Sequence, residues 1–298
     1  MPPAPTANGD IDAQAPQWFL QALAHPGSSA HVTANGVRLH YLTWNPDDSS
    51  KPVLLLVHGF RSHAHWWDWT APYLAEGYRI VAPDLSGMGD SERRGAYVPD
   101  TWAQDLIGFL DALGLQAVVA VGHSYGGSTL LRACRGRPDL FSRLILLDTT
   151  MTFADEAATP PPPPLPTANT CYPDLETAAA RFILRPRQPE ALPFLLRHIA
   201  RHSARQDPDG WRWKFDPAAY PFDRYRYDGE DLLAGCPRPV DYVRAQCSGT
   251  TSPARASILA QAMERVRGGR MIEIPAAHHH MMIDQPIAVI TALRTLLA

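Results

Sequence analysis

Apolar runs alternate with amphipathic stretches along most of this chain. Helix-like patterns separate the runs, notably at 101–113 and 124–135, and strands that alternate with helices indicate βαβ units and a parallel sheet. The strand-like runs are 52–57 (PVLLLV), 78–84 (YRIVAPD), 117–122 (AVVAVG) and 143–148 (RLILLD), and the first is apolar on both faces, as a buried parallel strand is. The pattern therefore predicts an α/β fold with a mainly parallel central sheet and helices on both faces.

The ends of the alternation predict the domain organisation. Residues 1–29 read as an N-terminal arm, and a hairpin around Asn35-Gly36 begins the core domain, which spans 30–148 and 236–298. Residues 149–235 break the alternation with a polyproline run at 160–164, helical patches and an aromatic stretch. This segment is expected to be an inserted, mostly helical cap, or lid, over the carboxyl edge of the sheet.

Composition narrows the possible partners and location. Hydrophobic residues make up 45% of the 298 residues, which favours a folded globular chain, and the net charge of −3 offers no basic surplus for binding nucleic acid. No apolar run is long enough to span a membrane, and the N-terminus lacks the pattern of a secretory signal. We expect a cytoplasmic protein without a membrane or nucleic-acid partner. Both a monomer and a homodimer are consistent with the sequence.

A serine lies between glycines where a buried strand meets a helix. The segment VGHSYGG places Ser124 in Gly122-x-Ser124-x-Gly126, directly after the run AVVAV. Such a turn leaves no room for bulky flanking side chains and exposes the serine hydroxyl at the carboxyl edge of the sheet, where ligands bind. The pattern predicts a nucleophile. The alternative is a glycine-rich turn with an ordinary capping serine.

Several further segments accompany this turn in a fixed order. With them, the chain resembles the α/β-hydrolase family, in particular serine esterases and lipases with a cap domain. The matching segments are HGF (58–60), PDLSGMGDS (83–91), GHSYGG (122–127), LLD (146–148) and HHHMMIDQP (278–286). Because the elbow residue is serine, the resemblance argues against the members with aspartate there, namely haloalkane dehalogenases and epoxide hydrolases.

The resemblance implies a catalytic triad in the order serine, acid, histidine. Relatives commonly carry the histidine just before a short helix with an acidic residue and proline. Alignment on Asp284-Gln285-Pro286 puts His279 at that place, and a metal-binding role for His278–His280 is the weaker alternative because no Cys or carboxylate ligands follow at a set spacing.

The acid departs from the usual family pattern. It usually follows the seventh strand, yet that loop reads AQCSGTTSP, without Asp or Glu. Asp241 begins the same strand and would lie about 15 Å short of the active edge. Asp148 ends its strand at that edge, and some relatives take the acid from this position, so we predict Asp148. Its alternative role is to cap the following turn.

The resemblance also implies the remaining site residues. Main-chain N–H groups of Phe60 and Tyr125 are expected to form the oxyanion hole, and no metal or cofactor is required. His123 and His58 are expected to be structural. Candidate substrate-binding side chains are Arg61, Trp66, Trp211 and Trp213, for which core packing, exposure or the cap's own small core are the alternatives.

These observations predict a serine hydrolase that cleaves carboxylic esters of small to medium apolar molecules through an acyl-enzyme. Two alternatives remain open. One is a hydrolase of lactone, amide or carbon–carbon bonds, and the other is a ligand-binding protein of this fold with little turnover.

Overall fold

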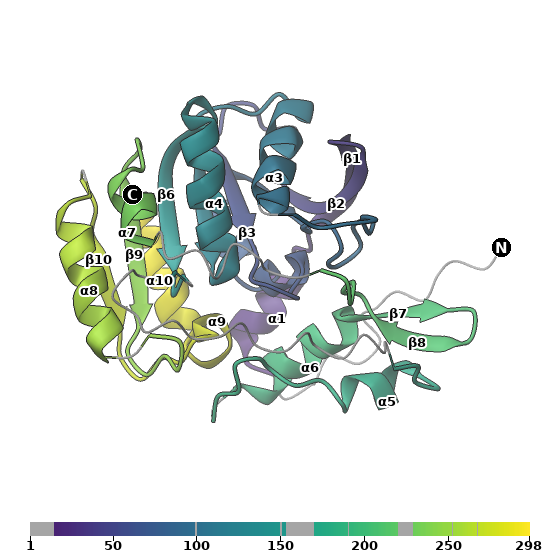
Figure 1. Cartoon of the computed structure of the whole chain (residues 1–298). Helices are drawn as coiled ribbons and strands as arrows, with labels where there is room; N and C mark the ends of the chain where they lie inside the picture. Colours follow the sequence, from purple (N-terminus) through teal and green to yellow (C-terminus); the bar gives the residue numbers. More distant parts are fainter. Residues whose placement is uncertain are drawn as a thin grey trace.

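An eight-stranded sheet runs through the middle of the computed structural model, in the order β1-β2-β4-β3-β5-β6-β9-β10 (Figure 1). β2 pairs antiparallel with β1 and β4, and the other neighbours are parallel, which confirms the predicted fold class. The strands are β1 (Ser28–Ala34), β2 (Val37–Trp44), β3 (Val53–Val57), β4 (Arg79–Pro83), β5 (Val118–His123), β6 (Phe141–Leu147), β9 (Val240–Ala245) and β10 (Met271–Ile274). The structure describes residues 15–98, 100–149, 151–152, 170–189, 191–219, 229–251, 253–266 and 268–298.

Helices cover both faces of the sheet because the strands are apolar on both sides. One buried cluster joins the sheet to α3, α4, α7 and α8, and the other joins it to α1, α2, α6, α9 and α10. The helical elements are α1 (Gln17–Leu23), η1 (Ala64–Trp67), α2 (Ala71–Leu74), α3 (Thr101–Ala112), α4 (Tyr125–Gly136), η2 (Pro138–Leu140), α5 (Leu175–Ala179), α6 (Pro193–His202), α7 (Gly229–Ala234), α8 (Pro253–Glu264), α9 (Met281–Asp284) and α10 (Pro286–Leu297). None of the helices within the described ranges has both the length and the apolar character needed to cross a bilayer.

The hairpin between β1 and β2 has the predicted turn. Ala34 pairs with Val37, and the two residues between them, Asn35 and Gly36, have φ angles of 49° and 73°. Both residues tolerate this left-handed region, which matches the twist of the flanking strands.

The segment between β6 and β9, which we call the insert, contains α5, α6, the two-stranded antiparallel sheet β7 (Ala204–Asp207) and β8 (Gly210–Trp213), and α7. Figure 1 shows α5, α6, β7 and β8 beyond the carboxyl ends of the central strands. Leu195 and Ile199 of α6 are fully buried in the same apolar cluster as α1 and α10, so this helix anchors the insert on the core. The polyproline run 160–164 and residues 1–14 of the arm lie outside the described residues.

The sequence pattern missed the β7–β8 hairpin. The helical pattern of residues 191–205 runs on to Arg205, but α6 ends at His202 and β7 starts two residues later. The turn residues Pro208 and Asp209 separate the two strands, and Gly210 begins β8; all three residue types favour a chain reversal. These turn residues are the sequence feature from which the hairpin could have been predicted.

Candidate active site

The turn between β5 and α4 holds Ser124 in a constrained conformation. Its φ and ψ are 55° and −123°, a region that non-glycine residues rarely occupy. A Cβ on Gly126 would lie 2.4 Å from the carbonyl oxygen of His58, and one on Gly122 would lie 2.7 Å from the backbone of Gly127. Both positions therefore need glycine because neighbouring backbone fills the space. Since α4 begins at Tyr125, its N-terminal N–H groups lie beside the serine.

Ser124, His279 and Asp148 form one hydrogen-bonded line. Oγ of Ser124 lies 2.9 Å from Nε2 of His279, and Nδ1 of the same ring lies 2.6 Å from Oδ2 of Asp148. All three residues are buried, with 8%, 3% and 0% of their surface exposed. With Nδ1–H donating to the carboxylate, Nε2 is left to accept a proton from the serine hydroxyl. The three residues come from the ends of β5 and β6 and from the turn after β10.

The loop after β9 supplies hydroxyl groups to Asp148. Ser248 and Thr250 donate to Oδ2 of Asp148 at 2.5 and 3.2 Å, and the N–H of Ala245 donates to Oδ1 at 3.4 Å. Burial alone would raise the pKa of Asp148, but the hydrogen bond and charge of His279 and the Ser248 hydroxyl hold it below its usual value. Sequence reasoning missed Ser248 and Thr250, although the two hydroxyl residues stand in the loop that lacks an acid.

Asp241 has a different partner set. It is fully buried at the start of β9, where Arg143 and Arg270 form ion pairs with it at 2.5 and 3.2 Å. These two ion pairs occupy the Asp241 carboxylate, which is not a partner of His279.

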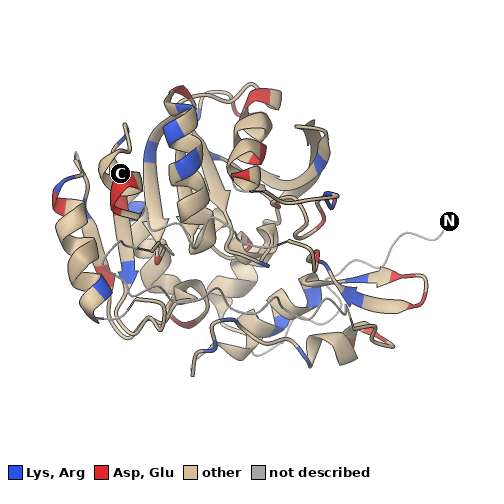
Figure 2. Ribbon diagram, in the orientation of Figure 1, with Lys and Arg blue, Asp and Glu red and all other residues tan. Residues whose placement is uncertain are grey.

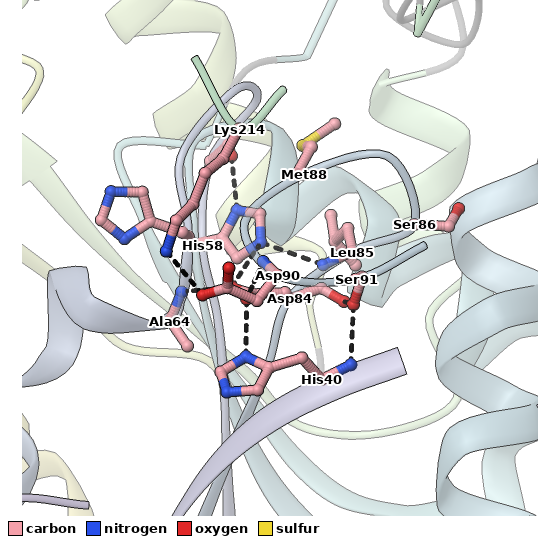
Figure 3. Close-up of polar contacts among 12 residues, drawn as sticks. His40, His58, Ala64, Asp84, Leu85, Ser86, Met88, Asp90, Ser91 and Lys214 are labelled. Carbon is pink, nitrogen blue, oxygen red and sulfur yellow. Dashed lines mark hydrogen bonds and ion pairs between the residues drawn. The ribbon is translucent and has the colours of Figure 1, made fainter. Parts of the chain in front are cut away.

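A buried aspartate organises the loops around Ser124. Asp84 accepts hydrogen bonds from the N–H groups of Ala64 and Asp90 and from Nδ1 of His40, at 2.6, 2.8 and 2.7 Å (Figure 3).

His58 links two of these loops. Its Nδ1 donates to the Gly59 carbonyl, its Nε2 accepts from the N–H of Leu85, and burial lowers the pKa of His58. The loop after β3 is thereby tied to the loop after β4.

The loop after β3 passes directly beside the serine. A Cβ on Gly59 would lie 3.3 Å from Cβ of Ser124, and the rings of Phe60 and Tyr125 pack edge to face with centroids 5.8 Å apart. Residues 59–60 and the start of α4 therefore both lie next to Ser124.

The neighbouring histidines have separate roles. Nε2 of His123 donates to the carbonyl oxygen of His279 at 2.9 Å, and burial lowers the pKa of His123 to about 3, so a neutral ring supports the backbone of His279. His278 instead bonds to Asp284 through both its N–H and Nδ1. The N–H of His280 donates to the side chain of Gln188 in the insert.

A cavity of about 280 Å³ lies between the core and the insert. Its lining includes Phe60, Arg61, Trp66, Trp213 and His280, and it does not include Trp211. Trp213 packs on Tyr172 and Phe182, whereas Trp211 pairs through its backbone with Tyr172. Of the predicted substrate-binding residues, Arg61, Trp66 and Trp213 therefore come together. Trp211 does not join them. It shares a face of β8 with Trp213 but lies two residues nearer the turn of the hairpin, about 7 Å further along the strand.

Among the described residues, three groups of His and Asp side chains bring potential metal ligands within 4.8 Å of one another: His123, His279 and His280; His65, Asp68 and His202; and His40, Asp84 and Asp90. Most of these side chains already hydrogen-bond within the protein. His279 bonds to Asp148 and Ser124, Asp68 accepts from His65 and His198, and Asp84 accepts from His40.

Comparison with known proteins matches this chain to one family. The model of the "Alpha/beta hydrolase family" matches residues 54–293. The esterase Rv0045c of Mycobacterium tuberculosis is 28% identical over 256 residues, which cover 83% of each chain. A soluble epoxide hydrolase of Corynebacterium is 37% identical over 115 residues. The latter match spans only about two fifths of each protein, 38% of this chain and 39% of the relative.

Solved structures share the fold over most of the chain. A thioesterase domain from the curacin biosynthetic pathway superimposes with a TM-score of 0.72 and 24% identity, over 90% of this chain and 98% of that one. E-2-(acetamidomethylene)succinate hydrolase gives a TM-score of 0.76 and 20% identity, over 91% and 99% of the two chains. At these identities the likeness concerns the fold.

Proposed function

Because the chain belongs to the alpha/beta hydrolase family, we propose that it is a serine hydrolase that cleaves carboxylic esters of small to medium substrates through an acyl-enzyme. The observation that carries the proposal is the line of hydrogen bonds from Ser124 through His279 to Asp148. The esterase relative, similar over most of both chains, supports the same reaction type. The proposal includes a cytoplasmic location and residues 149–235 as a cap.

In the first half-reaction, Oγ of Ser124 attacks the ester carbonyl carbon while Nε2 of His279 takes the hydroxyl proton. Asp148 accepts Nδ1–H, keeps the ring in the required tautomer and stabilises the imidazolium that forms. The tetrahedral oxyanion is held by the N–H groups of Phe60 and Tyr125, and loss of one such donor typically costs about 3 kcal/mol of barrier stabilisation.

Collapse of this intermediate breaks the bond to the alcohol, which leaves with the proton from Nε2 of His279. Water then enters, gives a proton to the same nitrogen and attacks the acyl-enzyme. Return of that proton to Oγ of Ser124 releases the acid and restores the site. No step requires a metal or cofactor.

The same groups also serve the cleavage of lactone, amide or carbon–carbon bonds, which therefore stand as alternatives. Epoxide hydrolysis is disfavoured because the elbow residue is Ser124, where the family pattern for that reaction has aspartate. A binding protein with little turnover is the alternative from another class.

The test is hydrolysis of 4-nitrophenyl esters, from acetate to palmitate, by the wild type, Ser124→Ala and the control Ser128→Ala. Ser128 lies one turn along α4, where its hydroxyl donates to the Tyr125 carbonyl. We expect activity in the wild type and the control, loss of at least about 10³-fold in Ser124→Ala, and labelling of Ser124 by a fluorophosphonate. Equal background rates in all three proteins, without labelling, would contradict the proposal.

A further inference from the structure

The charged residues that line the cavity between the core and the insert are all cationic. Among its lining residues, Arg61, Arg181, Arg185 and Lys214 are cationic, and none is Asp or Glu. Lys214 is neutralised by Asp90, 2.6 Å away. Figure 2 shows further Lys or Arg positions, in blue on the ribbon, along α6 and in the neighbouring insert. The positive charges at the cavity therefore outnumber the carboxylates among the described residues that pair with them.

Arg61, Arg181 and Arg185 carry this excess. Within the described part of the chain, none of the three forms an ion pair with a carboxylate. Burial, together with the nearby charge of Arg185, lowers the pKa of Arg61 to about 10, so the Arg61 guanidinium remains protonated at neutral pH. The exposed charge of Arg185 lies near the half-buried Arg61, and a bound anion relieves the repulsion between them.

Aromatic rings hold the Arg61 side chain in place. Its guanidinium carbon lies 4.2 Å from the ring centroid of Phe215 and 5.5 Å from that of Phe60. Its Nε and the Nε1 of Trp66 are buried donors without an acceptor among the described residues. A planar guanidinium fixed in this way is suited to bind a carboxylate through two N–H groups.

The cavity adjoins the reacting groups. Phe60, whose ring packs against Tyr125, and His280, whose ring centroid is 4.9 Å from that of His279, both line it. We propose that this cavity binds a free carboxylate of the substrate through Arg61, with Arg185 adding positive charge, so that the enzyme prefers acidic esters such as half-esters of short dicarboxylic acids. This assignment rests on the proposed function and names the substrate class of the same site.

The experiment compares two substrates that differ in one charge: the mono-4-nitrophenyl ester of glutaric acid and the same compound with its free acid methylated. The wild type should show a kcat/KM at least about tenfold higher for the acid, the gain expected of one charge-assisted hydrogen bond. Arg61→Met should abolish this preference, and Arg61→Lys should restore part of it. The control Arg187→Met removes an exposed charge from the same segment as Arg185, outside the cavity lining, and should leave the preference unchanged.

A wild-type enzyme that hydrolyses both esters equally, or prefers the methylated one, would overturn the assignment while the proposed function stands. If neither ester is hydrolysed, calorimetric binding of glutarate tests the cavity separately. Glutarate binding that is weakened at least about tenfold by Arg61→Met, and is unchanged by Arg187→Met, supports the carboxylate site. The carboxylate site is overturned if the wild type does not bind glutarate, or if both variants bind it equally well. It is also overturned if inorganic phosphate binds more tightly than glutarate.

Discussion

Oγ of Ser248 lies 2.5 Å from Oδ2 of Asp148, across the carboxyl ends of β9 and β6. The carboxylate that contacts His279 comes from one strand, and the hydroxyl that bonds to it comes from the loop after the next. Thr250 in the same loop reaches both Asp148 and Nδ1 of His279, at 3.2 and 3.1 Å. The loop that carries the acid in many relatives thus supports an acid placed elsewhere.

Ser248→Ala removes a hydrogen bond to the Asp148 carboxylate, so the pKa of Asp148 should rise toward its usual value. Activity should fall about three- to tenfold at pH 7, within the range of one hydrogen bond to a charged group, and more at pH 5. The measurement is the pH profile of kcat/KM. Ser248→Thr, which keeps a hydroxyl, is the matched control. An unchanged profile in Ser248→Ala would mean that this bond does not affect the charge of Asp148.

Asp148→Asn and Asp241→Asn should separate catalysis from stability. In Asp148→Asn the carboxylate that holds the His279 tautomer is lost, so kcat should fall about 10³- to 10⁴-fold. Asp241→Asn leaves Arg143 and Arg270 without their buried partner, so the free energy of unfolding should fall by about 1–3 kcal/mol with kcat nearly unchanged. Ester hydrolysis and urea unfolding of both variants test this. A large loss of kcat in Asp241→Asn would argue against the assignment of the acid.

Gly126→Ala should be strongly destabilising. The added Cβ would lie 2.4 Å from the His58 carbonyl oxygen and 2.6 Å from that of Val57, and both belong to backbone that cannot rotate away. We expect a loss of at least about 3 kcal/mol of unfolding free energy, measured by urea unfolding, together with loss of ester hydrolysis. Gly95→Ala, where nothing lies within 4 Å of the added carbon, should behave as wild type.

Stability should fall as the pH is lowered, partly because of His123. Burial and the nearby His279 lower the pKa of His123 from 6.5 to about 3, so the unfolded chain takes up a proton before the folded protein does. The stability that this residue contributes is complete above about pH 6.5 and is lost as the pH falls toward 3, with a slope of up to about 1.4 kcal/mol per pH unit.

The measurement is urea unfolding between pH 7.5 and 4.5. His123→Gln keeps an N–H donor for the carbonyl of His279 and removes the titrating ring. The free energy of unfolding of this variant should therefore change less steeply with pH, by the equivalent of up to one proton. An identical slope in the variant would show that His123 does not contribute. His65, whose pKa is raised because Asp68 outweighs burial, acts in the opposite direction and loses its contribution as the pH rises.

Local patterns predicted the strands, the hairpin at Asn35-Gly36 and the turn at Ser124, because each depends on residues close together in the chain. The hairpin β7–β8 was missed because its short strands follow a strongly helical pattern. The turn at Pro208–Asp209 is the local signal for it. The contrast between Trp213, which lines the cavity, and Trp211, which does not, depends on how the hairpin packs.

The sequence by itself determined the α/β fold class, the nucleophile turn and a short set of candidate acids and bases. Apolar periodicity and glycine spacing are local properties, and an aspartate at the end of a parallel strand must lie at the carboxyl edge. Only the tertiary structure brought Ser248 to Asp148, separated Asp241 into a pair with two arginines, and gathered Arg61 and Arg185 at one cavity. These relationships join segments far apart in the chain, and the packing of the strands and the insert, not any local pattern, sets their distances.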